Sequence, residues 1–158
     1  MLSLALQRAL GGEPLARYAE RRLWQPLGME DHGIWSLDRE DGFEKAWCCL
    51  AGSARDLAKL GRLVLSRGKA GSLRLVPADW FDIAMRTPAA AGGGREYARS
   101  WRPAGPDRAD AMAVGKDGQF LSVDPATRTI VVRLGGSFGG FAMSQWAEVF
   151  RALSRHAW

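Results

Sequence analysis

The residues AVGKDGQFLSVDPATRTIVVRL (113–134) carry the clearest strand pattern in the chain. Two runs rich in β-branched and apolar side chains, QFLSV (119–123) and TIVVRL (129–134), flank a turn at Asp124-Pro125-Ala126-Thr127, which predicts an antiparallel pair. AMAV (111–114) predicts a strand before them. Lys116-Asp117-Gly118 lies between AMAV and QFLSV. It is either a bend with Lys116 in solvent or a place where a ligand or another backbone approaches the glycine closely.

Helical patterns precede the strands. Apolar residues recur at helical intervals over 2–10, and a second helix is expected from Pro14 to before Pro26. Ser53 and Asp56 form a capping-box pattern that predicts a helix start, and Gly68 predicts its end. A short helix should open at Pro77. The expected buried sides are Leu15, Tyr18, Ala19 and Leu23 in the second helix, Leu57, Leu60, Gly61 and Val64 in the third, and Trp80, Ile83 and Ala84 in the fourth.

A last helix is expected over 141–156, with a core stripe formed by Trp146, Val149, Phe150 and Leu153. Helices followed by an antiparallel meander and a packed terminal helix indicate an α+β fold. We expect one partial domain over 1–158, mainly helical in 1–88 and with antiparallel strands in 95–135, of which YARSW (97–101) is the first candidate.

Composition narrows the class of protein. The 158 residues are 47% hydrophobic and 25% charged, which is typical of a globular chain. The net charge of +5 is scattered, and no nucleic-acid module surrounds the arginines, so we expect no nucleic-acid partner. No apolar run is long enough for a membrane span, and no signal peptide is visible, so we expect no membrane partner. This predicts a cytoplasmic protein by default, or a periplasmic one if an N-terminal segment precedes Met1.

Cysteine and histidine are too sparse for a metal site. Cys48 and Cys49 are the only cysteines, and backbone geometry strains a bridge between adjacent residues, so no disulfide framework is expected. His32 and His156 are far apart, and no CxxC spacing occurs. We therefore expect no metal and no cofactor.

A serine nucleophile is hard to assign. Ser66-Arg67-Gly68-Lys69 matches the Ser-x-x-Lys spacing of acyl-transferring serine hydrolases, in which the lysine lies one helical turn after the serine. Here Ser66 stands at the end of an expected helix, and Gly68 ends that helix. The pair should therefore not form, and no Ser-His-Asp set is evident.

Several blocks together resemble one family. LARYAERRLWQPLGMEDHGIW, AGSARDLAKLGRLVLSRGKAGSLRLVPADW, YARSW and AVGKDGQFLSVDPATRTIVVRLG are similar to the serine β-lactamase and D-alanyl-D-alanine peptidase-like hydrolases, nearest to the class C and 6-aminohexanoate-dimer hydrolase-like branch. The resemblance begins just after the family's second motif. It therefore implies the C-terminal half of the fold, with helices of the all-α lobe followed by the sheet and the closing helix.

The resemblance also implies a role for Lys116-Asp117-Gly118, which occupies the place of the family's Lys-Thr-Gly motif beside the active-site cleft. Lys116 would bind the substrate carboxylate or assist proton movement, Gly118 would admit the substrate backbone, and the Gln119 N–H would donate to the oxyanion. Trp101 would border the same site. Asp117 replaces the family's hydroxyl residue and would repel an anionic substrate, which favours a neutral or cationic amide or ester.

The family's Ser-x-x-Lys nucleophile motif is expected to lie outside these residues. The complete enzyme would then be a serine hydrolase that cleaves a small amide or ester through an acyl-enzyme, and this chain alone should be inactive. An open sheet edge would favour association with the missing half or self-association. The alternative is a non-catalytic binding module that keeps the cleft strand and holds an anionic ligand on Lys116.

Overall fold

The computed structural model describes residues 1–84, 100–103 and 110–156. The chain divides into two compact units, Met1–Asp56 and Leu57–Trp158. The boundary falls in the first turn of a helix, α3 (Ala54–Leu65). The mixture of helices and antiparallel strands confirms the α+β class.

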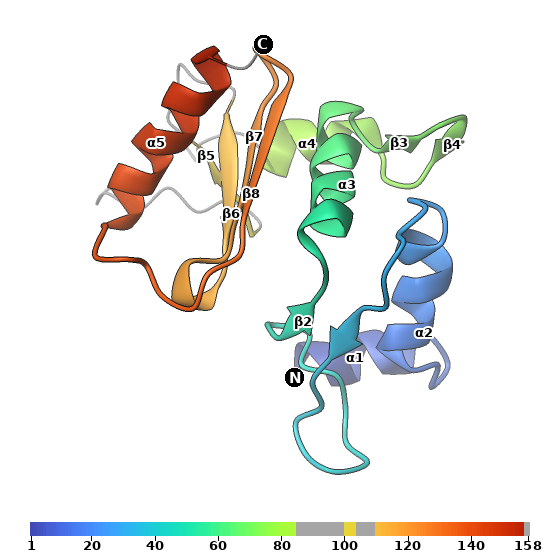
Figure 1. The fold of residues 1–158 in the computed structure, drawn as a ribbon. Helices are drawn as coiled ribbons and strands as arrows, with labels where there is room; N and C mark the ends of the chain where they lie inside the picture. The colour runs from blue at the N-terminus through green and yellow to red at the C-terminus, as the bar shows by residue number, and fades with distance from the viewer. Residues whose placement is uncertain (85–99, 104–109, 157–158) are drawn as a thin grey trace. The chain divides into compact units, whose positions relative to one another are not determined.

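The first unit consists of helices and a small hairpin (Figure 1). The helices are α1 (Leu2–Ala9), α2 (Leu15–Ala19) and its continuation η1 (Glu20–Trp24), and the hairpin pairs β1 (Ile34–Trp35) with β2 (Leu50–Ala51). Both helices start and stop as the sequence predicts. Of the expected apolar side, Leu15 is buried, whereas Tyr18 is 37% exposed.

The two cysteines depart from the expectation for adjacent residues. The structure joins Cys48 to Cys49 in a disulfide just before β2. The backbone of Cys49 takes the left-handed conformation, with a φ of 72°, and this conformation accommodates the ring.

The start of α3 confirms the capping box. Ser53 Oγ accepts a hydrogen bond from the Asp56 N–H at 3.2 Å and donates one to Asp56 Oδ2 at 3.0 Å. The Asp56 carboxylate is fully buried and also accepts the N–H groups of Glu30 at 2.8 Å and Asp31 at 2.9 Å. One aspartate therefore fixes both the helix terminus and the preceding loop.

The second unit is built on a four-stranded antiparallel sheet in the order β5-β6-β7-β8. A short hairpin and a helix precede it. The elements are β3 (Lys69–Ala70), β4 (Leu73–Arg74), α4 (Ala78–Ala84), β5 (Arg102–Pro103), β6 (Ala111–Val114), β7 (Phe120–Asp124), β8 (Thr129–Arg133) and α5 (Met143–His156). The three strands of the opening stretch are confirmed. Residues 97–99 of the candidate strand YARSW lie outside the described residues.

Alternation along the strands gives the sheet two apolar faces. Leu121 and Val123 join Val64 of α3 and Phe81 of α4 in one cluster. Met112 and Phe120 point the other way and join Phe150 of α5 in a second cluster. Helix α5 therefore covers one face, and α3 and α4 cover the other (Figure 1).

The buried side of α4 differs from the expected one. Phe81 and Ala84 are buried, whereas Trp80 and Ile83 are 37% and 46% exposed. The expected face is thus wrong at two positions. Phe81 packs into the first cluster, and Trp80 meets its ring edge-on with the centroids 5.0 Å apart.

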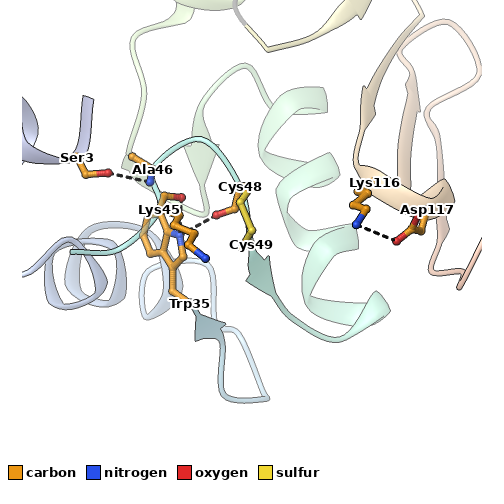
Figure 2. The surroundings of a disulfide bond; sticks show 8 residues. All are labelled: Ser3, Trp35, Lys45, Ala46, Cys48, Cys49, Lys116 and Asp117. Carbon is orange, nitrogen blue, oxygen red and sulfur yellow. Dashed lines mark hydrogen bonds and ion pairs between the residues drawn. A yellow bond between two sulfur atoms is a disulfide. The ribbon is translucent and has the colours of Figure 1, made fainter. Parts of the chain in front are cut away.

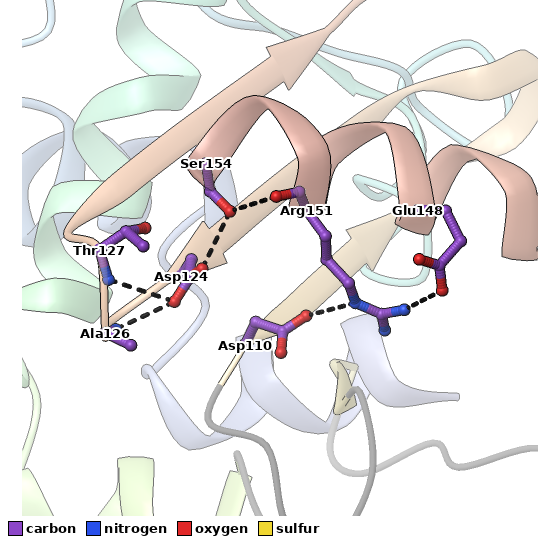
Figure 3. Close-up of polar contacts among 7 residues, drawn as sticks. All are labelled: Asp110, Asp124, Ala126, Thr127, Glu148, Arg151 and Ser154. Carbon is purple, nitrogen blue, oxygen red and sulfur yellow. Dashed lines mark hydrogen bonds and ion pairs between the residues drawn. The ribbon is translucent and has the colours of Figure 1, made fainter. Parts of the chain in front are cut away.

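Helix α5 is also rotated from its expected stripe. Trp146 and Phe150 pack on the sheet, but Val149 and Leu153 are 38% and 51% exposed. The buried Ser154 lies on the sheet side, where its hydroxyl donates to Asp124 Oδ2 at 3.0 Å (Figure 3). A polar anchor therefore replaces the apolar contact expected for this turn of the helix.

Further polar contacts hold α5 beside the strands. Arg151 Nε donates to Asp110 Oδ2 at 3.0 Å, and the two side chains are only 16% and 15% exposed (Figure 3). Asp124 Oδ1 accepts the N–H groups of Ala126 and Thr127 at 3.0 and 3.4 Å, which confirms the turn predicted there. These contacts fix the register of the helix along the sheet.

Candidate functional site

Lys116-Asp117-Gly118 forms a tight turn between β6 and β7. Asp117 has a φ of 57° and a ψ of 29°, and Gly118 has a φ of 78°. Two successive positive φ values are the mark of a type I′ hairpin turn, for which Asp-Gly is a preferred pair. The sequence therefore carried a hairpin signal here, in addition to the family motif.

The lysine of this turn points into solvent. The Lys116 side chain is 91% exposed and its Nζ lies 3.9 Å from Asp117 Oδ2, with Asp117 itself 54% exposed (Figure 2). Such an exposed pair adds little stability. Both charges are therefore free to meet a ligand from solution.

The expected oxyanion donor is engaged in the turn. The Gln119 N–H donates to the Lys116 carbonyl at 3.3 Å, and the Gly115 N–H donates to the Gln119 carbonyl at 2.8 Å. The Gln119 N–H would have to leave this long bond, or share it, to reach an oxyanion. The side chain of Gln119 also has a structural role. Its Nε2 donates a hydrogen bond to the Gly135 carbonyl, and its Oε1 accepts one from the Gly135 N–H.

Arg133, which the sequence pattern did not single out, stabilises the turn through hydrogen bonds to backbone carbonyls. Its guanidinium donates to the Gly118 carbonyl at 2.5 Å and to the Ser137 carbonyl at 2.9 Å. The same group lies over the Trp146 ring, 4.3 Å from the centroid. Arg133 thus links the turn to α5 through hydrogen bonds and a cation–π contact.

Gly118 is buried on the Arg133 side. A Cβ atom there would lie 2.2 Å from Arg133 Nη1 and 2.6 Å from the Ser137 carbonyl oxygen. Both the left-handed φ and the lack of space therefore require glycine at this position. The signal for Arg133 was a charged residue at the end of an apolar strand, two residues before the glycine-rich stretch 135–140.

The other predicted site residues lie elsewhere in the unit. Trp101 is half-buried and packs against the cluster of α3 and α4. The structure confirms that Ser66 and Lys69 do not share a helix, because α3 ends at Leu65 and Gly68 turns the chain with a φ of 87°. Lys69 already belongs to β3.

The described part of the chain holds neither a metal-binding cluster nor a membrane-spanning helix. No group of three or more His, Cys, Asp or Glu side chains in residues 1–84, 100–103 and 110–156 could hold a metal ion. Over the same residues, no helix has the length and hydropathy needed to span a membrane.

Comparison with known proteins gave consistent matches. A model of the Beta-lactamase family matches residues 1–153. The 6-aminohexanoate-dimer hydrolase of Paenarthrobacter ureafaciens is 31% identical over 127 residues, which cover 71% of this chain and 31% of that protein. The chain therefore spans about a third of this curated relative's length.

Solved structures match the fold. A Bacillus anthracis protein assigned as a 6-aminohexanoate-dimer hydrolase superposes with a TM-score of 0.86 at 23% identity, covering 98% of this chain and 41% of that one. A β-lactamase from Mycobacterium bovis gives a TM-score of 0.65 at 20% identity, covering 98% of this chain and 60% of that one. These likenesses confirm the β-lactamase-like fold.

Proposed function

Because this chain belongs to the beta-lactamase family, we propose that it forms part of a serine hydrolase that cleaves an amide or ester through an acyl-enzyme. The family match over residues 1–153 carries the proposal. In this chemistry a serine hydroxyl attacks the carbonyl carbon and loses its proton to a base, and the amine or alcohol leaves with a proton. Water then hydrolyses the acyl-serine and restores the hydroxyl.

The nucleophile and its base come from polypeptide outside these 158 residues. The match to the Paenarthrobacter hydrolase covers only 31% of that protein, which leaves ample chain to supply them. Within this chain, Ser66 and Lys69 are separated by a helix end, so the lysine cannot take the serine proton. The proposal therefore predicts that the chain alone is inactive.

This chain supplies the Lys116 side of the site. The exposed ammonium of Lys116 binds the polar end of the substrate, and the Gln119 N–H donates to the oxyanion once the turn releases it. Gly118 belongs to the substrate-binding set carried over from the family motif, and Trp101 is included because it lies beside the strand that borders the site in the family.

An amide or ester without a net negative charge suits this turn best. Lys116 and Asp117 present one positive and one negative group 3.9 Å apart. The named substrate of the curated relative, a 6-aminohexanoate dimer, is an amide with an amino group at one end and a carboxylate at the other. Penicillin-like anions suit the turn less well, because Asp117 repels them.

The sheet edge is where the complementary polypeptide pairs. In the described sheet β8 is one of the two terminal strands, and four of its five residues are β-branched. An apolar edge of this kind attracts a further strand. Association with the complementary half would cover this edge, and self-association is the competing outcome.

Labelling with a fluorophosphonate tests the proposal. The purified chain is treated alone and after co-expression with a polypeptide equivalent to the unmatched part of the Paenarthrobacter hydrolase, and the products are weighed intact. We expect an adduct only in the complex, on a serine outside this chain, together with hydrolysis of 6-aminohexanoate dimer. An adduct on Ser66 would refute the external nucleophile, and a complex that forms without an adduct would refute the acyl-enzyme.

Two lysine variants distinguish a specific role of Lys116 from a general effect of losing one positive charge. Lys116→Ala should lower hydrolysis by the complex about a hundredfold, the scale typical of a lost charge-stabilising group. Lys69→Ala removes another exposed lysine of the same unit and should leave the rate unchanged. Equal effects of the two substitutions would contradict the assigned role of Lys116. Binding of small carboxylates by the chain without any hydrolysis in the complex would favour the binding-module alternative.

A further inference from the structure

The adjacent cysteines belong to the first unit, whereas the turn at Lys116 belongs to the second. Cys48 and Cys49 are the only cysteines of the chain, and the structure joins them across a single peptide bond (Figure 2). Cys48 is half-buried and Cys49 is exposed. A thiolate from solution can therefore approach the bridge, which is the requirement for thiol–disulfide exchange.

The backbone around the bridge is held by the facing strand. The indole N–H of Trp35 donates to the carbonyls of Lys45 at 3.0 Å and Cys48 at 3.1 Å (Figure 2). The Ser36 N–H donates to the Cys49 carbonyl at 3.1 Å. Both cysteine carbonyls are thus fixed by residues in or next to β1.

The conformation of Cys49 is unfavourable for an open chain. Its φ of 72° lies in the left-handed region, which non-glycine residues avoid. A ring closed between neighbouring residues restricts this backbone, whereas two free thiols leave Cys49 able to return to an ordinary φ. That return would rotate the Cys49 carbonyl away from the Ser36 N–H.

We propose that Cys48 and Cys49 form a reversible thiol–disulfide site that controls the pairing of β1 with β2. A small thiol or dithiol is the reductant. One thiolate attacks a bridge sulfur to give a mixed disulfide and one free cysteine thiolate. A second thiol then releases the other cysteine, so that the protein gains two protons and two electrons while two reductant thiols become one disulfide. The ring orders the hairpin, and reduction loosens it.

Counting thiols tests the chemistry. The purified full chain is denatured, treated with N-ethylmaleimide and weighed, either directly after exposure to oxidised glutathione or after dithiothreitol. We expect no adduct in the first case and two in the second, with the oxidised mass restored when oxidised glutathione is added back. Two reactive thiols after the oxidised glutathione treatment, or none after excess dithiothreitol, would overturn the proposal.

Amide hydrogen exchange tests the structural consequence. Reduction should raise the exchange rate of the Ser36 amide about fivefold to thirtyfold, which is the left-handed penalty of about 1–2 kcal/mol expressed as a population ratio. The double variant Cys48→Ala/Cys49→Ala should exchange at the fast rate in both conditions, and amides of α5 should not respond in either chain. Equal Ser36 exchange in the oxidised and reduced chain would overturn the switch even if the bridge itself forms.

Discussion

Replacing Asp56 by alanine should cost more stability than any other change at a helix start in this protein. The carboxylate is fully buried and accepts two backbone N–H groups, from Glu30 at 2.8 Å and Asp31 at 2.9 Å. Each donor left without a partner costs about 1–3 kcal/mol. Two such donors give a summed range of about 2–6 kcal/mol. Because the loop can shift and expose the donors to water, we expect a loss in the lower half of this range, about 3 kcal/mol of unfolding free energy.

Chemical and thermal unfolding followed by circular dichroism measure this effect. A loss of about 3 kcal/mol corresponds to a drop in Tm of about 6–12 °C for a chain of this size. Asp56→Asn keeps one acceptor oxygen and should lose about half as much. The matched control is Asp79→Ala, an exposed acidic residue in the first turn of α4, worth only about 0.3–1 kcal/mol through the helix dipole. Equal losses for Asp56→Ala and Asp79→Ala would refute the reasoning.

Three further changes follow from packing, charge and the turn. Gly61→Ala should lower the free energy of unfolding by about 1–2 kcal/mol, because the new Cβ would lie 2.7 Å from Ile130 Cγ2. This crowding outweighs the gain in helix propensity. Urea unfolding measures the difference. The hydrogen bond from the Phe43 N–H lowers the pKa of Asp38, so this bond stabilises the fold above the ordinary aspartate pKa and is lost as pH falls through the lowered pKa. An NMR titration of the Phe43 amide should therefore show a midpoint below that of an unperturbed aspartate. Asp38→Asn should abolish this titration of the amide signal. Arg133→Met should cost about 2–3 kcal/mol and speed amide exchange around the turn, since two carbonyls lose a charged donor; unchanged unfolding would contradict the support assigned to Arg133.

Local patterns predicted the elements better than the faces of the helices. The strands β6, β7 and β8 follow from β-branched runs and a turn that its own aspartate closes. The buried side of α5 could not be read from hydropathy, because Ser154 is buried through its bond to Asp124, 30 residues away in sequence. Hydropathy favoured Leu153, which is exposed.

The candidate site shows the same limit at closer range. The Asp-Gly turn was readable from two neighbouring residues, because the preference for positive φ is local. The support from Arg133 depends on its contacts with Gly118, Ser137 and Trp146 in the folded chain. The spacing of these residues in the sequence does not predict the contacts.

The burial of Gly118 determines which experiments on its turn can be interpreted. A library that scans residues 116–118 would find the glycine intolerant whatever the substrate, because any side chain there meets Arg133 and the Ser137 carbonyl. Intolerance at Gly118 is therefore uninformative about chemistry, although a family motif invites the opposite interpretation. Lys116 and Asp117 are the informative positions. Because their side chains are exposed, substitutions there should change substrate recognition more than folding.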